Sequence, residues 1–422
     1  SMVLVGFHIL SASALIFLAL KTSFFMTLYI FLICLPMLIF MKYAVTIQSK
    51  LGQTLAKVRN KFSGDITDRI NGLFQVHVGN NINFHQYSSL YIKPDNHQWV
   101  ISSISEEYKK IFYELGINIL KETEFYQLKK QAIFYLSKYD ALFKIDKKKM
   151  HRIAFPYYHG FPDQHEAFKK CIETLKLNHE YYSRIQVTNS KIQNLILETG
   201  IDKSKVFKIP ISIDLDIIDM FKYQSKQKIR SNYNIPQNAF VIGSFQKDGD
   251  GWGNGNNPKL DKGPDILIKI ISALKNEIPE LFVLLSGPSR GYVKNQLSKL
   301  GIKFMHIYLE KYEDIFLLYK SIDLYLVTSR DEGGPRAILE SMASKCPIIS
   351  SKVGQAVDLI VNNQNGWLID IGNIDDYVER IKYVYNANVD KQLNQGLITA
   401  KQNSYRAQTN IWKKFMNGFI EN

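Results

Sequence analysis

Two glutamates, Glu332 and Glu340, are separated by seven residues around the expected start of a helix. Carboxylates at such a place can accept hydrogen bonds from the hydroxyl groups of a ligand. The preceding residues, 322–328, form a short, mostly apolar run with β-branched and aromatic members and therefore predict a buried strand. Gly333 and Gly334 then allow the backbone to turn sharply and to approach a ligand closely. The sequence thus predicts a strand, a glycine turn and a helix that together carry two carboxylates.

The residues after the two glycines favour a phosphate group at the helix start. Pro335 suits the first helical position, because its missing N–H would have no partner there in any case. The free N–H groups and the positive end of the helix dipole favour an anion. Glu332 would remain in the loop beside that phosphate, and Glu340 could accept hydrogen bonds from two hydroxyl groups. A phosphate next to a polyol is what a nucleotide sugar requires, although any single glutamate is more often an ordinary surface residue.

The whole string resembles the donor-site motif of retaining glycosyltransferases of family four. The similarity consists of the two glutamates, the Gly-Gly-Pro-Arg between them (residues 333–336) and the Glu-Ser-Met-Ala that ends the motif. Residues 347–355 resemble the next strand and glycine-containing loop of that family, and residues 365–369 resemble its following small strand. The resemblance covers most of the second half of the chain, with weaker similarity in the first half. It implies the GT-B fold, which has two facing doubly wound α/β domains and a cleft between them.

The resemblance also implies the reaction, the transfer of a sugar from a nucleotide diphosphate sugar with retention of configuration. Lys247 and Lys262 take the places of the basic residues that neutralise the donor diphosphate in the family, which is electrostatic catalysis. Glu332 would hold hydroxyl groups of the transferred sugar, and Glu340 would hold the ribose hydroxyls. The remaining residues expected to bind the donor are Gly243, Gly287, Arg290, Gly333, Gly334, Pro335 and Arg336. Uracil and guanine are equally compatible with these residues.

His159 is the candidate catalytic residue in the first half of the chain. It follows a strand predicted over residues 153–158, and its position resembles that of a histidine near the transferred sugar in the family. A lone histidine is more often structural, but the adjacent Gly160 and the place at a strand end favour a functional role. Residues 80–95, rich in Asn, Tyr and Ser, are expected to form a loop for acceptor recognition.

Residues 248–257 are rich in Gly, Asp and Asn and favour a flexible loop. They do not follow the spacing of a calcium loop and lack its closing Glu, and no Lys-Ser/Thr helix start follows them as in a phosphate loop. A mobile flap over the donor, with Trp252 as its apolar contact, and a disordered surface loop remain as alternatives. No Asp-x-Asp metal site at a strand end is visible, although Asp248 and Asp250 are acidic. We therefore expect no metal and no cofactor beyond the nucleotide sugar.

The N-terminal part of the chain predicts attachment to a membrane. Residues 3–20 and 24–41 are apolar, and each run is about the 20 residues that cross a bilayer. They could form a hairpin of two spans, or one run could span while the other lies at the surface. The basic residues that follow are expected on the cytoplasmic side of a bacterial-type inner membrane; they are Lys42, Lys50, Lys57, Arg59, Lys61 and Arg69.

The length of 422 residues predicts two globular domains with additional segments. Strands of the first domain are expected at residues 73–79, 98–104, 139–145 and 153–158. The three cysteines are far apart, so neither a disulfide framework nor a zinc spacing is visible. We expect a membrane hairpin at residues 1–45 and a basic juxtamembrane segment at 46–70. An acceptor-side α/β domain should follow at 71–212, and a nucleotide-sugar-binding α/β domain at 213–400. Residues 401–422 should form a C-terminal helix that packs back on the first domain.

The net charge of +14 implies an acidic partner, which could be a nucleic acid, an anionic lipid or a phosphorylated substrate. The predicted membrane anchor favours a lipid-linked or glycan acceptor in the assembly of cell-surface polysaccharide. A GT-B nucleotide-sugar epimerase and an inactive sugar-nucleotide-binding homologue are rival interpretations. A basic membrane- or nucleic-acid-binding scaffold would instead require clustered Lys and Arg with stacking aromatics. Because the basic residues are mostly scattered outside the juxtamembrane segment, we expect no nucleic-acid partner.

Overall fold

The computed structural model describes residues 89–94, 100–125, 132–145, 151–251 and 253–420, which all belong to one compact unit. Both predicted apolar runs, the basic segment after them and the expected strand at residues 73–79 lie outside the described residues. Within the described ranges, none of the helices combines the length and the apolar composition that a bilayer crossing needs.

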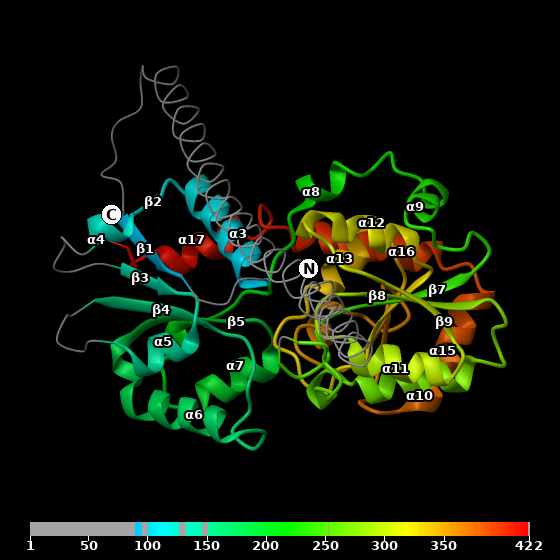
Figure 1. Cartoon of the computed structure of the whole chain (residues 1–422). Coiled ribbons are helices and arrows are strands. Elements are labelled where there is room, and N and C mark those ends of the chain that lie inside the picture. The colour runs from blue at the N-terminus through cyan, green and yellow to red at the C-terminus, as the bar shows by residue number, and fades with distance from the viewer. Residues whose placement is uncertain (1–88, 95–99, 126–131, 146–150, 252, 421–422) are drawn as a thin grey trace, which may run out of the picture. The chain divides into compact units, whose positions relative to one another are not determined.

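Among the described residues, the first sheet has six parallel strands in the order β2-β1-β3-β4-β5-β6 (Figure 1). Its strands are β1 Ser89–Lys93, β2 Asn118–Ile119, β3 Ala132–Tyr135, β4 Arg152–Tyr157, β5 Tyr182–Val187 and β6 Val206–Lys208. Its helices are α3 Val100–Glu114, α4 Glu122–Phe125, α5 Lys138–Phe143, α6 Glu166–Asn178 and α7 Ser190–Leu197, with the short turns η1 His179–Tyr181 and η2 Lys203–Lys205. Neighbouring residues of β4, Ala154 and Phe155, enter two different cores, so helices cover both faces of the sheet.

The second sheet has six parallel strands in the order β12-β11-β10-β7-β8-β9. Its strands are β7 Phe240–Phe245, β8 Leu281–Ser286, β9 Lys303–Ile307, β10 Leu324–Val327, β11 Ile348–Ser351 and β12 Trp367–Ile369. Its longer helices are α10 Pro264–Leu274, α11 Gly291–Lys299, α15 Ile374–Asn386 and α16 Asp390–Gln402. Its shorter ones are α8 Leu215–Asp219, α9 Lys226–Asn232, η3 Leu260–Lys262, η4 Tyr312–Asp314, α12 Ile315–Ser321, α13 Ala337–Ala343 and α14 Ala356–Leu359. Counted from β7, the strand order 3-2-1-4-5-6 is that of a dinucleotide-binding fold.

Burial explains why these strands read as apolar runs in the sequence. All six residues of β8 are buried, as expected for a parallel strand with helices on both faces. In β7, Val241 enters one core and Ile242 the core on the opposite face. The prediction of two doubly wound α/β domains is therefore confirmed, and the strand predicted at residues 153–158 is confirmed as β4.

Three local predictions in the first domain are wrong. Residues 98–104 and 139–145 were expected as strands, but the helices α3 and α5 occupy most of them. In α3 the buried residues Ile104, Tyr108 and Ile111 recur at helical spacing, which a window of seven residues does not reveal. Residues 89–93, expected in a loop, form β1 in the interior of the sheet, because Leu90 and Ile92 supply alternating apolar contacts.

The C-terminal helix α17, Thr409–Met416, belongs to the core of the first sheet. Figure 1 shows this red helix beside the cyan α3. Trp412 lies edge-on to Tyr108 and Phe112 of α3, with ring centroids 5.1 and 5.4 Å apart. The chain therefore returns from the second domain to complete the first.

Candidate functional site

The carboxyl ends of β7 and β10 define the candidate site. These neighbouring strands begin the two halves of the second sheet, and ligands of open α/β sheets bind where the strand order reverses. The segments after the two strands touch each other. Gly263 has φ +62°, and a Cβ atom there would lie 1.9 Å from the Thr328 carbonyl oxygen. The Thr328 hydroxyl donates a hydrogen bond of 3.0 Å to the Gly263 carbonyl, which fixes the two segments together.

Lys262 and Glu332 form an ion pair across this junction. The Lys262 Nζ atom lies 2.7 Å from Glu332 Oε1, and the side chains are 25% and 15% exposed. The Ser329 hydroxyl donates to the same carboxylate at 2.9 Å. Gln246 donates to the Lys262 carbonyl at 3.0 Å and so ties η3 to the end of β7. The structure thus brings together two of the predicted catalytic residues at a place that solvent can reach.

His159 of the first domain lies next to the same loop. Its Nδ1 atom is 3.9 Å from the Oδ2 atom of Asp331, the residue that precedes Glu332 in the sequence. Burial, followed by the positive charges of Lys138 and Lys262, lowers the pKa of His159 to about 3. Because 46% of the side-chain surface remains exposed, solvent moderates the effect of these charges on the ring. The imidazole is neutral at neutral pH and offers one donor and one acceptor.

The first domain holds the glycine turn of the motif. The Thr188 hydroxyl and the Asn189 amide donate to the Gly333 carbonyl at 2.7 and 3.1 Å. A Cβ atom on Gly333 would lie 2.6 Å from the Tyr158 carbonyl oxygen, so no side chain fits there. A Cβ atom on Gly334 would lie 2.7 Å from the Cδ1 atom of Ile211, which follows β6 in the segment that leads to the second domain. Both glycines thus allow the two domains to approach each other.

The helix start differs in detail from the prediction. Pro335 was expected at the first helical position, but α13 begins at Ala337, with Arg336 as the N-cap residue. Arg336 is buried and carries an ion pair of 2.5 Å from Nη2 to Glu107 Oε1 of α3. Its Nε atom lies 3.4 Å from Glu340 Oε1. Arg336 therefore joins the motif to the first domain and places its single positive charge between two carboxylates.

Glu340, predicted to hold ribose hydroxyls, already has protein partners. Its carboxylate accepts hydrogen bonds from the hydroxyls of Tyr312 and Tyr319, and the bond from Tyr319 is 3.0 Å long. The side chain is 5% exposed. A ribose at this position would have to replace these phenols or join them.

The sequence analysis missed Glu107, which extends this network into α3. Its carboxylate accepts from the Ser212 hydroxyl at 2.7 Å in addition to its ion pair with Arg336. Burial raises the pKa of Glu107, and the charge of Arg336 counteracts that rise. Its position between the buried residues Ile104 and Ile111 would have been a signal only if the helix α3 had been predicted.

Arg290 lies beneath the strand ends rather than on their open side. It is 1% exposed, and its Nε atom lies 3.0 Å from Asp248 Oδ1. Its Nη1 group donates to three backbone carbonyls, at 2.6, 2.9 and 2.8 Å from those of Ser244, Gln246 and Ser286. The guanidinium therefore supports the ends of β7 and β8 from within.

The loop at residues 248–259 is bonded to the start of α11 at several points. Its two arms pair between Gly249 and Pro258, and backbone groups of Gly291 and Tyr292 donate to the carbonyls of Asn254 and Gly255 at 2.7 and 2.8 Å. These contacts give no support to the interpretation as a freely moving flap. Trp252, the expected apolar contact of that flap, lies outside the described residues.

The other predicted donor residues occupy different environments. Gly243 lies inside β7, where a Cβ atom would be 2.5 Å from Ile322 Cδ1, so it serves packing in this structure. Gly287 has φ +94° at the end of β8 and approaches the Gln246 carbonyl. Lys247 is half-buried, and burial lowers its pKa. In the described parts of the chain, no three potential metal ligands gather at one point.

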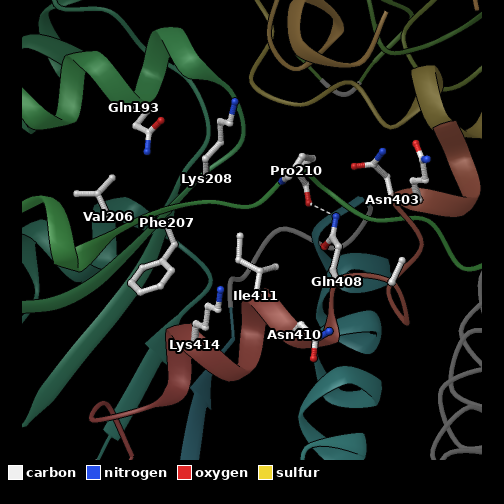
Figure 2. A pocket seen from close by; sticks show the side chains of 12 residues that line it. Gln193, Val206, Phe207, Lys208, Pro210, Asn403, Gln408, Asn410, Ile411 and Lys414 are labelled. Carbon is white, nitrogen blue, oxygen red and sulfur yellow. Dashed lines mark hydrogen bonds between the residues drawn. The ribbon is translucent and has the colours of Figure 1, made fainter.

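A separate pocket of about 620 Å³ lies beside the linker between the two domains (Figure 2). It is lined by Gln193, Val206, Phe207, Lys208, Pro210, Gln402, Asn403, Ala407, Gln408, Asn410, Ile411 and Lys414. Gln408 donates to the Pro210 carbonyl at 3.0 Å, and Lys208 is already paired with Asp358 at 3.0 Å. None of the predicted donor or catalytic residues reaches this pocket.

Comparisons with known proteins agree with this geometry. Residues 257–403, which include Lys262, Glu332 and Glu340, match the family glycosyl transferases group 1. The UDP-Gal:alpha-D-GlcNAc-diphosphoundecaprenol alpha-1,3-galactosyltransferase of Escherichia coli is 27% identical over 53% of this chain and 53% of its own length. The D-inositol 3-phosphate glycosyltransferase of Corynebacterium jeikeium is 22% identical over 46% of each chain. The chain thus spans about half the length of these curated relatives.

Solved structures show the same fold. Anabaena HepE, in complex with UDP and glucose, has a TM-score of 0.60 at 15% identity and covers 79% of this chain and all of its own. A glycosyltransferase from Rickettsia africae has a TM-score of 0.60 at 17% identity, with 79% and 99% coverage. These likenesses show the GT-B fold, and the family match shows that residues 257–403 are similar to a glycosyl transferases group 1 domain.

Proposed function

We propose that the protein is a retaining glycosyltransferase that moves a sugar from a nucleotide diphosphate sugar to a lipid-linked or glycan acceptor. The observation that carries this proposal is the accessible Lys262–Glu332 pair at the strand-order reversal of a group 1 domain, with His159 of the other domain beside it. The name of the Escherichia coli relative, with its UDP-Gal donor and diphosphoundecaprenol-linked acceptor, supports this choice of substrates. The UDP and glucose bound to Anabaena HepE support a UDP-sugar as the first donor to test.

The charges at the site suit the departure of a diphosphate. As the bond between the sugar C1 and the phosphate oxygen breaks, negative charge develops on the leaving group, and the Lys262 ammonium can stabilise it. Glu332 would then release Lys262 and accept hydrogen bonds from the sugar hydroxyls. The neutral imidazole of His159 can bind a further hydroxyl. The acceptor oxygen attacks C1 from the same face, and its proton passes to the leaving phosphate oxygen, so retention needs neither a protein nucleophile nor a metal.

The cellular setting remains part of the proposal. We propose that the apolar N-terminal runs anchor the protein in a bacterial-type inner membrane, with both α/β domains in the cytoplasm. The predicted anchor would bring the site to a lipid-linked acceptor. The basic residues after the second run would then face anionic headgroups.

The decisive experiment is ligand binding to the full chain in detergent, followed by product analysis. We expect one nucleotide among UDP, GDP, ADP and CMP, with UDP as the first candidate, to raise the melting temperature. A ligand at 100 times its dissociation constant adds about 2.7 kcal/mol to stability. Lys262→Ala should weaken this shift, whereas Lys269→Ala, which changes an exposed lysine of α10, should leave it intact. With the matching sugar donor, NMR of the product should show the donor's anomeric configuration.

Two results would count against the proposal. A folded protein that responds to none of these nucleotides would favour the inactive homologue or the scaffold. A protein that binds the nucleotide and interconverts its sugar, without transfer to any acceptor, would favour the epimerase.

A further inference from the structure

Lys138 is a buried lysine that the sequence analysis did not single out. It is the first residue of α5, and its side chain is 7% exposed. Its ammonium group donates a hydrogen bond to the carbonyl oxygen of His159. The same group lies 4.2 Å from the ring centroid of Tyr157 and 4.7 Å from that of Phe168. Because burial of a cation is unfavourable unless it is well paired, this lysine is expected to serve a specific contact.

The contact in question is the turn that carries His159. Gly160 has φ +108°, and a Cβ atom there would lie 2.6 Å from Phe168 Cδ1 and 3.0 Å from the Lys138 Nζ atom. The Tyr157 hydroxyl donates to the Gly160 carbonyl at 2.9 Å. Two consecutive carbonyls of the turn, those of His159 and Gly160, therefore accept hydrogen bonds from the side chains of Lys138 and Tyr157. The ring of Phe168 packs against Gly160 beside them.

This support also fixes the direction of the imidazole. The His159 ring lies edge-on to Phe168, with centroids 5.5 Å apart and an interplanar angle of 90°. Its Nδ1 atom then faces Asp331 of the other domain at 3.9 Å. Without the bond to Lys138 the backbone of the turn could change its conformation, and the direction of the His159 side chain toward this loop would no longer be fixed.

We propose that Lys138 is a positioning residue of the transferase reaction: it holds the His159 carbonyl and thereby aims the imidazole at the Asp331–Glu332 loop. The proposal rests on the proposed function, because His159 matters to turnover only if a sugar is transferred at this loop. Lys138 itself is too deeply buried to touch a substrate. It acts through the turn and not on the reacting atoms.

A double-mutant cycle on the full chain separates positioning from a general structural role. We expect Lys138→Met to lower kcat about 10- to 100-fold, since a misplacement of about 1 Å can have this effect, with little change in the donor KM. In the His159→Ala background the imidazole is absent, so the same substitution should change kcat by less than about twofold. A change of that size is no larger than the deviation from additivity that independent substitutions usually show. Lys144→Met, which removes a 70% exposed lysine from the end of the same helix, is the matched control and should behave as wild type.

A second readout does not depend on turnover. In protein with labelled histidines, the signal that His159→Ala removes reports on His159. Lys138→Met should move this signal and raise its titration midpoint, because the charge of Lys138 lowers the pKa of His159. The charged groups that face the ring from the surrounding elements are Lys138 of α5, Lys259, Asp261 and Lys262 near η3, and Asp331 after β10.

The outcomes are distinct. If Lys138→Met lowers kcat equally with and without the His159 imidazole, or leaves the His159 signal and its titration unchanged, the proposal is overturned. If the wild type transfers no sugar, the proposed function fails, and the histidine signal still decides whether Lys138 holds the turn. Should Lys138→Met fail to fold, Tyr157→Phe removes the neighbouring bond to Gly160, and its cycle with His159→Ala tests the same support.

Discussion

Two ion pairs at the carboxyl ends of the second sheet differ in burial. The Lys262–Glu332 pair is 2.7 Å long, with side chains 25% and 15% exposed. The Arg290–Asp248 pair is 3.0 Å long, and both side chains are fully buried. The two pairs are alike in charge and in distance. Because the first pair is open to solvent, Lys262 can give up Glu332 for a diphosphate, and Glu332 can give up Lys262 for a sugar hydroxyl. Arg290 cannot do this, because backbone carbonyls enclose it.

The difference shows that charge near a strand end does not by itself make a binding residue. The resemblance implied donor contacts for both Lys262 and Arg290, and burial distinguishes their roles in this structure. We infer that the region around Arg290 keeps the loop at residues 248–259 in place, while the region around Lys262 is available for chemistry. The predictions below test this division, from the largest expected free-energy effect to the smallest.

Removal of the buried guanidinium should destabilise the protein most. Arg290→Met leaves Asp248 charged and enclosed without a cation, and the breaking of a buried pair costs about 3–5 kcal/mol. Urea denaturation followed by circular dichroism measures the loss. Asp248→Leu in addition to Arg290→Met should recover part of it, because no charge then remains buried while the three carbonyls stay without their donor. A loss below about 1 kcal/mol would mean that solvent reaches this pair.

Removal of the accessible lysine should act on turnover rather than on folding. Lys262→Ala is expected to lower kcat about 10²–10³-fold, which corresponds to about 2.7–4 kcal/mol of transition-state stabilisation. Its melting temperature should stay close to that of the wild type, since Glu332 can still be solvated. Steady-state kinetics with saturating donor measures the effect, and Lys269→Ala is the control. If Lys262→Ala melted far below the wild type at full activity, the roles of the two regions would be reversed.

The loop above Arg290 offers a matched pair of glycines. Gly255 has φ +70°, and a Cβ atom there would lie 2.2 Å from the Ser289 carbonyl oxygen, whereas Gly251 has φ +67° with no atom within 4 Å. Both alanine variants incur about 1 kcal/mol of left-handed strain, and Gly255→Ala adds a steric clash. We expect a total loss of about 2–3 kcal/mol for Gly255→Ala, a usual size for a packed site. Equal losses in the two variants would show that the loop is not docked on α11.

The sequence predicted the second domain better than the first. Its strands are short apolar runs buried on both faces, such as β8, and its motif residues are close together in the chain. In the first domain, residues 98–104 and 139–145 contain similar short apolar runs, but the helical spacing of Ile104, Tyr108 and Ile111 extends past them. A window of about seven residues therefore could not distinguish a helix from a strand in these two segments.

The candidate site was predictable where its residues follow strand ends. Glu332 and His159 were singled out after predicted strands and Lys262 from the family resemblance, and the structure places them around one loop. Glu107 and Lys138 were missed, because their function depends on contacts across the fold. Glu107 meets Arg336 from a position 229 residues away in the chain. Spacing within a motif cannot reveal such a contact.

A third ion pair tests whether burial or pairing explains the contrast. Lys382 Nζ lies 2.5 Å from Glu277 Oε2, and the side chains are 45% and 47% exposed, so this pair is shorter than the buried one and open to water. Lys382→Met should cost about 0–1 kcal/mol, because solvent replaces the lost partner, and should lower the melting temperature by less than about 2–4 °C. The effect should vanish near 1 M salt, where the Debye length is about 3 Å. If Lys382→Met were as costly as Arg290→Met, charge pairing alone would govern all three sites, and burial could no longer assign Arg290 to structure and Lys262 to chemistry.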